Sequence, residues 1–532
     1  MYRNFKPVMI LFMSTILLWS CQDDLELKPE DNRETSATVF DNPDSYREFT
    51  AKLYAGFSLS GQQGPAGNAD LAGLDEGFSN YMRLFFKLQE LTTDEAVIGW
   101  NDGTIKDLHS QTWTSGNEFI RTMYSRLLYQ IALTNEFLRQ TTDAKLDARG
   151  VTGDLKSEIA EYRAEARFLR ALSYYHAMDL FGNPPFVTEE DPIGAFLPPQ
   201  IQRADLFSYI EGELLAIEST IVPARQNEYG RADQAAVWML LSKLYLNSEV
   251  YTGQGRYTDV IAYTTKVIQA GYSIPDVPYQ YLFLADNDTN GAQEEVIFPI
   301  TFDGLNTQAY GGMTFIIHAS IGGSMDPANF GVSSGWAGLR TTPQFVNLFP
   351  NGAESEDKRA IFYTEGQNKE INNISVFTDG FAVAKYKNVD INGNQGSDST
   401  GEFPDTDFPM FRLADAYLMY AEAVLRGGGG STGEAVTYIN ELKERAYGDS
   451  SGNIAASDLT LDFIINERGR ELYWEAQRRT DLIRFNQFTE NGIWAFKGGV
   501  PQGTTTSSFR NIMPIPASDL GVNTNLKQNP GY

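Results

Sequence analysis

The sequence predicts a mainly α-helical protein in which tetratricopeptide-like helix pairs form one scaffold, interrupted by an irregular excursion rich in loops and short strands. Apolar residues recur at three- and four-residue spacing over long segments on both sides of the middle of the chain. Between them, residues 271–400 are rich in Gly, Asn, Asp and Thr. No regular repeat period occurs, but three helical segments place small residues beside large ones: 166–175, 235–246 and 413–423.

The first residues predict an export signal over 1–20. A positively charged start precedes the apolar stretch Val8–Trp19, which is too short to span a bilayer. It ends in Leu18-Trp19-Ser20-Cys21, which is similar to a bacterial lipobox although Trp19 departs from the usual small or aliphatic residue. Because Cys21 is the only cysteine in the chain, we predict that it carries a lipid, against the alternative of an ordinary signal peptide with a chance cysteine. The acidic residues in the tract 22–26 resemble the surface-export signal of Bacteroidetes lipoproteins.

Helices dominate the first half of the chain. Residues 22–42 are polar and predict an extended segment, 43–58 predict a helix, and 59–77 predict a Gly-rich loop. Apolar periodicity then predicts further helices over 117–140, 156–181, 203–220, 233–250 and 256–270. The run Gly182-Asn183-Pro184-Pro185 ends the second of these helices, because neither Gly nor Pro continues a helix.

The middle of the chain changes character and the helices then return. Glu295–Ile300 and Met313–Ile317 are short apolar runs that predict strands. Apolar periodicity predicts helices again over 410–426, 432–445 and 459–486, and Gly427–Gly430 predicts a loop between the first two. We therefore expect one domain over 21–532, with its helical scaffold at about 43–270 and 405–532 and its loop-rich region at about 271–404.

Charge and composition exclude several classes of function. Lys and Arg total 42 against 69 Asp and Glu, which leaves a formal net charge of −27. This acidity argues against a nucleic-acid binder and against electrostatic docking on anionic lipid. A single cysteine excludes an intrachain disulfide and a cysteine-cluster metal site, and the three histidines are not spaced for zinc. Nucleotide-binding loops and the serine-hydrolase elbow are absent, but paired-carboxylate hydrolases need no local motif and stay open.

Three stretches carry a family resemblance: Ala164–Pro185, Arg412–Ala423 and Glu467–Arg484. Together with the ending Pro514–Tyr532 they resemble the SusD/RagB family of surface glycan-binding lipoproteins, and the similarity spans nearly the whole mature chain. Within the family, the chain is most similar to the starch-binding founding member. The resemblance implies a non-catalytic, lipid-anchored protein on the cell surface that binds starch or malto-oligosaccharide (an α-glucan) and delivers it to a SusC-like TonB-dependent transporter in the outer membrane.

Aromatic residues are the expected platform for the sugar, because the apolar faces of a pyranose stack on Trp and Tyr rings. The resemblance implies that Trp100, Tyr310 and Trp336 form an arc around a curved glucan. All three lie in Gly-rich, loop-like surroundings, which favours exposure over core packing. The alternative is buried loop packing.

Polar groups complete the implied site. The resemblance implies that Asp75 accepts hydrogen bonds from sugar hydroxyls and that Arg83 donates them; the alternative is a surface ion pair between the two. Ile98 replaces a second Trp and Gly103 replaces a sugar-contacting Asn, so the preferred glucan stays open. Asn101 or Asp102 could compensate only if their loop shifts.

A calcium site is a further expectation. Asp286–Gly291 opens like an EF-hand loop, but position 12 is Ile297, so oxygens from elsewhere would be needed. The resemblance implies that Asp405 and Asp407 supply them together with Asp288, and hard oxygen ligands favour a structural Ca²⁺. The alternative is a pair of Asp-rich turns.

Two other functions remain compatible with the sequence. One is a surface glycoside hydrolase, whose paired acids would carry no local signature. The other is a family member that binds a different glycan or a peptide.

Overall fold

The computed structural model describes residues 38–532 except 66, 73–74, 76 and 195. The predicted export signal, Cys21 and the acidic tract lie outside the described residues. Residues 46–532 form one compact unit, and the features below belong to it. No helix in the described part of the chain is long and apolar enough to cross a membrane.

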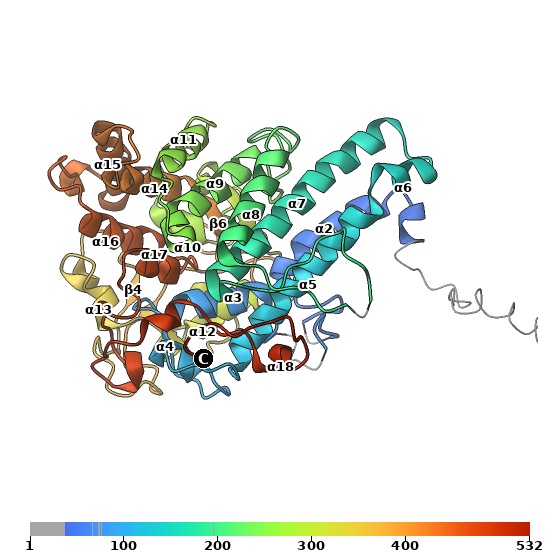
Figure 1. The fold of residues 1–532 in the computed structure, drawn as a ribbon. Helices are drawn as coiled ribbons and strands as arrows, with labels where there is room; N and C mark the ends of the chain where they lie inside the picture. Colours follow the sequence, from blue (N-terminus) through green and yellow to red (C-terminus); the bar gives the residue numbers. More distant parts are fainter. Residues whose placement is uncertain (1–37, 66, 73–74, 76, 195) are drawn as a thin grey trace, which may run out of the picture. The chain divides into compact units, whose positions relative to one another are not determined.

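The predicted mainly α-helical fold is confirmed, and Figure 1 shows its central feature, an array of neighbouring helices. Each helix of the array packs against the next in chain order. The array runs through α5 (Glu118–Gln140), α7 (Gly153–Phe181), α8 (Arg203–Ile217), α9 (Gln234–Leu246) and α11 (Tyr257–Ile268). The second half of α7 is buried nearly all round, because α5 and α8 cover two of its sides.

The array continues with helices from the end of the chain. Helix α14 (Leu413–Leu425) packs against α11, although residues 269–412 separate them in the sequence. Small residues on α14, among them Ala416 and Ala423, are fully buried and let the helices approach closely. Helix α14 in turn contacts α15 (Thr432–Tyr447) and α16 (Leu461–Leu472).

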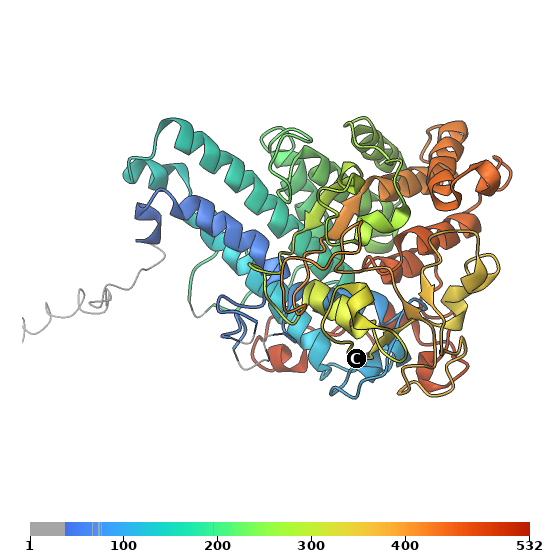
Figure 2. The same cartoon turned by 180° about the vertical axis from the view of Figure 1, so that it is seen from behind.

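The loop-rich region leaves this array after α11 and returns before α14. Strand β2 (Val296–Ile300) pairs antiparallel with β6 (Phe408–Arg412), so the start and the end of the region lie side by side. This confirms the strand predicted over Glu295–Ile300. Figure 2 shows the region, coloured from yellow-green to orange, on the face opposite the helices α8–α11 of Figure 1.

Two elements differ from the prediction. Met313–Ile317 belongs to a helix, α12 (Gly312–Ala319), and not to a strand. Every residue of α12 is buried, and a short run that is apolar on all sides carries no period that distinguishes helix from strand.

The helix predicted over 459–486 is divided into α16 and α17 (Arg478–Arg484). Trp474 and Ala476 take left-handed backbone angles, with φ of 60° and 58°, and these end the helical path. The sequence did not predict helix α3 (Tyr81–Glu90), although nine of its ten residues are buried.

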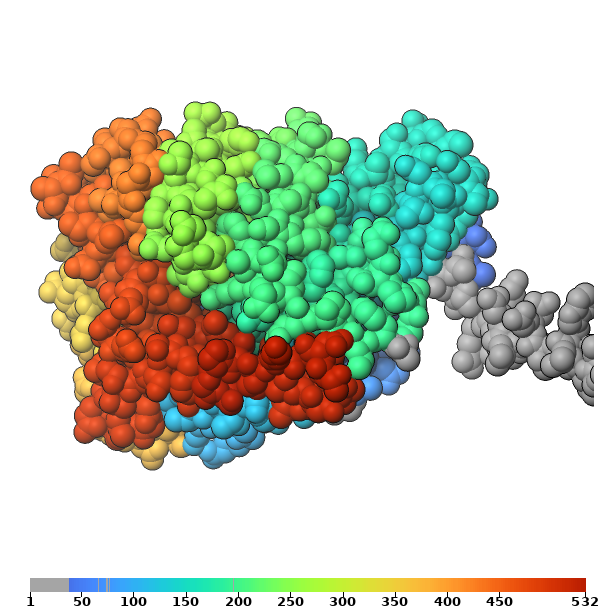
Figure 3. Space-filling view, in the orientation of Figure 1, coloured from blue at the N-terminus to red at the C-terminus, as the bar shows by residue number. Residues whose placement is uncertain are grey.

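The C-terminal segment crosses the outside of the helical array. Figure 3 shows these residues, in red, as a belt along one edge of the face shown. The Met513 N–H donates to the Leu180 carbonyl at 2.7 Å, and the Asn529 side chain donates to the Phe181 carbonyl at 2.8 Å. These bonds satisfy carbonyls at the end of α7 that have no partner within the helix.

Candidate functional site

Two tryptophans from distant parts of the chain lie together on the loop-rich side. Strand β1 (Val97–Ile98) pairs antiparallel with β3 (Leu339–Arg340), which brings Trp100 beside Trp336. Their ring centroids are 6.4 Å apart with an interplanar angle of 44°. The Trp100 Nε1–H donates to the Trp336 carbonyl at 3.0 Å, and both side chains are half-buried. Each indole is thus anchored at one edge and accessible on part of its surface.

Helix α12 supports both indoles from below. The Phe315 ring meets Trp100 edge-on at 5.8 Å, and the His318 ring stacks on Trp336 at 4.8 Å. Burial lowers the pKa of His318, although backbone carbonyls at both ring nitrogens favour the protonated form. The sequence prediction missed both residues because it assigned this segment to a strand. The signal that would have found them is the (i, i+3) spacing of two aromatic side chains.

Arg83 connects Tyr310 to this aromatic group. The Arg83 Nη1 donates to the Tyr310 carbonyl at 2.9 Å, and the guanidinium lies 4.7 Å from the centre of the Phe315 ring. Asn80, the N-cap of α3, accepts from the Arg83 backbone N–H and from Gly312 N–H, and so fixes α3 against α12. Burial lowers the pKa of Arg83 to about 10, while the negative charges of Asp102 and Asp75 act in the opposite direction.

Asp75 lies at the exposed end of the same region. Its Oδ1 accepts from the Phe78 N–H at 3.0 Å, and the carboxylate stays accessible. Gly77 packs against Tyr310 so closely that a Cβ on it would lie 2.6 Å from the Tyr310 Cβ. Tyr310 itself is half-buried, with its ring 5.6 Å from that of Phe403. No ion pair between Asp75 and Arg83 is present among the described contacts, and Arg83 instead bonds to Tyr310.

The two positions that depart from the family pattern add no aromatic ring and no polar side chain to this group. Ile98 is buried within β1, opposite Leu339. At Gly103, where φ is 42°, an added Cβ would lie 1.6 Å from the Glu118 Oε1. Asn101 and Asp102 are exposed directly after Trp100 and are the polar side chains available at this edge.

A buried lysine lies behind the aromatic group. The Lys87 Nζ is 4.4 Å from the centre of the Phe119 ring, 5.0 Å from Phe315 and 5.5 Å from Phe78. It has no hydrogen-bond partner among the described residues. Burial, together with the charge of Arg83, holds the pKa of Lys87 well below its ordinary value.

The three predicted calcium ligands lie in one region but are bonded to protein groups. Asp407 is buried; its Oδ1 accepts from the Phe302 N–H at 2.7 Å and its Oδ2 from the Tyr229 hydroxyl at 2.9 Å. Burial, together with the nearby charges of Asp288 and Asp405, raises the pKa of Asp407 to about 7. A cation would offset this repulsion. In the part of the chain that the structure describes, however, no group of three or more His, Cys, Asp or Glu side chains has the arrangement of a metal site.

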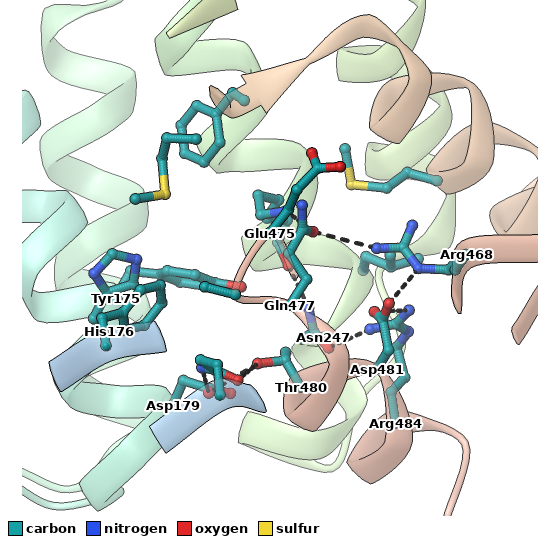
Figure 4. A pocket seen from close by; sticks show the side chains of 18 residues that line it. Tyr175, His176, Asp179, Asn247, Arg468, Glu475, Gln477, Thr480, Asp481 and Arg484 are labelled. Carbon is teal, nitrogen blue, oxygen red and sulfur yellow. Dashed lines mark hydrogen bonds and ion pairs between the residues drawn. The ribbon is translucent and has the colours of Figure 1, made fainter. Parts of the chain in front are cut away.

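The motif Glu467–Arg484 builds a polar interior instead of a surface site. Figure 4 shows part of this interior around a cavity of about 30 Å³, which has room for about two water molecules. Arg468 donates to Asp481 at 2.7 Å, and Arg484 donates to Asn247 at 2.9 Å. Thr480 donates to Asp179 at 3.0 Å, which links α17 to α7. Because these charges are paired within the scaffold, we assign the motif to folding.

Comparisons with known proteins agree with the fold. The model of the SusD family matches residues 371–532. The starch-binding protein SusD of Bacteroides thetaiotaomicron is 37% identical to this chain, and the match covers 96% of each protein. SusD-like protein P2 of Formosa agariphila is 26% identical over 74% of this chain and 78% of its own length.

Solved structures share the architecture at lower identity. A surface glycan-binding protein A from Bacteroides thetaiotaomicron, in complex with laminarihexaose, aligns with a TM-score of 0.69 at 18% identity and covers 91% of this chain and 99% of its own. A SusD superfamily protein from Parabacteroides distasonis aligns with a TM-score of 0.69 at 22% identity, over 94% of this chain and 100% of its own.

Proposed function

The chain belongs to the SusD family, and from this premise we propose that it is a non-catalytic protein of the cell surface that binds a starch-type α-glucan at Trp100, Trp336 and Tyr310. It then delivers the oligosaccharide to a SusC-like TonB-dependent transporter. The 37% identity to a starch-binding protein over almost the full length supports this choice of glycan.

The observation that carries the proposal is the contact between Trp100 and Trp336. The two indoles are joined across β1 and β3, and their planes differ by 44°. Two aromatic faces inclined in this way suit a ligand that curves, as a helical α-glucan does, because successive sugar rings change direction along the chain. The buried support from Phe315 and His318 holds the faces in place before the ligand arrives, which lowers the entropy cost of binding.

Polar groups around the indoles supply the hydrogen bonds that a sugar needs. Asp75, Asn101 and Asp102 are exposed and can accept from hydroxyl groups. Arg83 is half-buried, and its Nη1 donates to the Tyr310 carbonyl beside these groups. In the family pattern, a Trp stands at the position of Ile98 and an Asn at the position of Gly103. Because this chain lacks that aromatic face and that amide, we expect it to bind each sugar more weakly than a site that has both.

Affinity electrophoresis against amylopectin, laminarin, levan and dextran tests the proposal. We expect amylopectin to retard the wild-type protein and to retard Trp336→Ala much less. Trp238→Ala, on α9 and remote from β1 and β3, is the matched control and should be retarded like the wild type. Retardation by laminarin without retardation by amylopectin would exclude the α-glucan, and retardation of Trp336→Ala equal to wild type would exclude the site. Release of reducing ends from amylopectin would favour the glycosidase alternative.

The anchor and the ion are separate parts of the proposal. A lipid on Cys21 would hold the protein at the outer membrane, which the export signal and the position of the cysteine support. A structural Ca²⁺ held by Asp288, Asp405 and Asp407 would tie the loop-rich region to the start of β6. The support for the ion is the family resemblance at these three positions, since the described side chains do not by themselves form the arrangement of a metal site.

A further inference from the structure

A second recess lies beside the candidate site and has the composition of a carbohydrate site. Its volume is about 270 Å³, just below the usual range for small-molecule sites. Helix α2 (Ser45–Ser58), α7, the turn 228–231 and the segment 301–307 form its walls. Three tyrosines line it: Tyr54, Tyr162 and Tyr229.

Tyr229 is the aromatic face that a ligand would meet. The residue is 46% exposed, and its hydroxyl donates to Asp407 at 2.9 Å, which fixes the direction of the ring. The next residue, Gly230, takes a φ of 84°, and an added Cβ would lie 2.7 Å from the Thr301 Cγ2. The turn is therefore held tightly against segment 301–307, and the ring is presented on a rigid support.

The charges at the rim of the recess balance. Arg47 pairs with Glu228 at 3.1 Å, and both side chains are more than half exposed. Arg231 pairs with Glu165 and, at 3.3 Å, with Glu228. Glu165 is fully buried and neutralises Arg231 from behind, so these pairs leave no net charge for an ionic ligand, whereas Arg47 and Glu228 offer a charged donor and a charged acceptor to hydroxyl groups. An aromatic face with balanced polar groups favours a neutral, polyhydroxylated ligand.

We propose that this recess is a second carbohydrate subsite, in which a sugar ring stacks on Tyr229 and exchanges hydrogen bonds with Arg47 and Glu228. The ligand class rests on the proposed function, whereas the position of the subsite rests on the recess itself.

The two sites share their supporting segments. Thr307 lines the recess, and Tyr310 follows three residues later, at most about 11 Å along the chain. Ser58 lines the recess, and its carbonyl accepts from the side chain of Asn80, the cap of the helix that carries Arg83. Both α2 and α12 lie on the face turned to the viewer in Figure 2. One glucan chain can thus contact both sites, which strengthens the binding of a polymer more than that of a short oligosaccharide.

Tyr229→Ala tests the subsite, with Tyr229→Phe as its matched control because Phe keeps the ring and loses only the bond to Asp407. We expect Tyr229→Ala to weaken retardation by amylopectin by about fivefold or more, because the polymer loses one of two linked contacts. The dissociation constant of maltotriose, measured by calorimetry, should change less than about twofold because Trp100 and Trp336 are intact. Tyr229→Phe keeps the stacking face and loses only the bond that orients it, so it should weaken retardation clearly less than Tyr229→Ala. Arg47→Ala should also weaken retardation, and it should not change the stability of the fold because the Arg47 side chain is exposed.

The outcomes separate this inference from the proposed function. If Tyr229→Ala and Arg47→Ala are retarded like the wild type while Trp336→Ala is not, the subsite is excluded and the main site stands. If amylopectin does not retard the wild type, the α-glucan is excluded. The same variants are then compared in a gel that contains the polymer, laminarin, levan or dextran, that does retard the wild type. Weaker retardation of Tyr229→Ala in that gel supports the subsite for that glycan. Retardation by none of the four polymers overturns both proposals.

Discussion

The Trp100 indole donates its Nε1–H to the backbone carbonyl of Trp336, across 236 positions of sequence. This bond attaches one tryptophan of the candidate site to the loop that carries the other. The two residues therefore have unequal roles: Trp336 contributes a ring and a carbonyl, whereas Trp100 contributes a ring and the bond that sets the angle between the rings. Substitutions should reveal the difference.

Trp336→Ala should weaken α-glucan binding by about 1–3 kcal/mol, by analogy with the loss of one aromatic face from a stacked base. Trp100→Ala should weaken it at least as much, because it also releases the loop of Trp336. Trp100→Phe keeps an aromatic ring without the Nε1–H and should give an intermediate loss. Calorimetry with malto-oligosaccharides measures the three affinities, and melting temperatures show whether each variant folds. Equal affinity in all three variants would contradict the two roles.

Gly103→Asn should destabilise the protein by about 1–2 kcal/mol and should not strengthen glycan binding. The backbone there has a φ of 42°, and a Cβ would clash with the Glu118 Oε1, which accepts from the Thr104 N–H at 3.1 Å. Gly116→Asn is the matched control, because its nearest neighbour would be 3.6 Å from the new Cβ. Urea unfolding measures both variants. Tighter glycan binding in Gly103→Asn at unchanged stability would show that the loop can shift to present a side chain at this position.

Between its lowered pKa and the ordinary lysine pKa of about 10.4, Lys87 should add to the free energy of unfolding as the pH rises. Burial holds the pKa of Lys87 well below its ordinary value in the folded state, whereas the unfolded chain keeps an ordinary lysine. In this window the unfolded state binds more protons than the folded state, so raising the pH favours folding. Lys87→Met should flatten the slope by up to about 1.4 kcal/mol per pH unit. Lys358→Met, at an exposed position, should leave it unchanged. Equal slopes in both variants would mean that Lys87 is not desolvated.

A chelator should lower the melting temperature if Ca²⁺ is bound between Asp288, Asp405 and Asp407. Binding to the folded state alone stabilises it by RT ln(1 + [L]/Kd), and the chelator removes this contribution. Asp405→Asn should abolish the response, whereas Asp154→Asn, an exposed position at the start of α7, should keep it. Metal analysis of the purified protein provides a second measurement. A melting curve that the chelator does not move, with no divalent ion in the sample, would favour Asp-rich turns without metal.

Cys21→Ser should release the protein from the membrane fraction without changing its affinity for glucan in solution. Because one acyl chain binds only marginally and several hold firmly, loss of the acylated cysteine removes the anchor. Neutralising Asp23, Asp24 and Glu26 should leave the protein membrane-bound but remove it from the cell surface. Membrane fractionation and surface protease accessibility measure the two effects. A Cys21→Ser protein that stays with membranes after a salt wash would contradict the assignment of the anchor.

Local sequence determined the helices of the array and where several of them end. The apolar period of 117–140 and 256–270 reappears in α5 and α11 within one or two residues, and α7 ends at Phe181, before Gly182. These features depend on contacts three or four residues apart and on single Gly and Pro positions, which a sequence displays directly. The same local information placed Trp100, Tyr310 and Trp336 in Gly-rich loops, whereas the family resemblance selected these three residues as candidates for the site.

Tertiary structure alone decided how the candidate residues meet. Trp100 and Trp336 come together because β1 and β3 pair, and two-residue strands carry no periodic signal. Segment 313–317 became a helix because its surroundings bury it on all sides, and burial overrides the weak local preference of a short apolar run. The recess at Tyr229 is built from four segments spread over residues 47–307, and none of its lining residues belongs to a motif. Such contacts depend on which distant surfaces fit one another, and the residues nearby in sequence do not encode that fit.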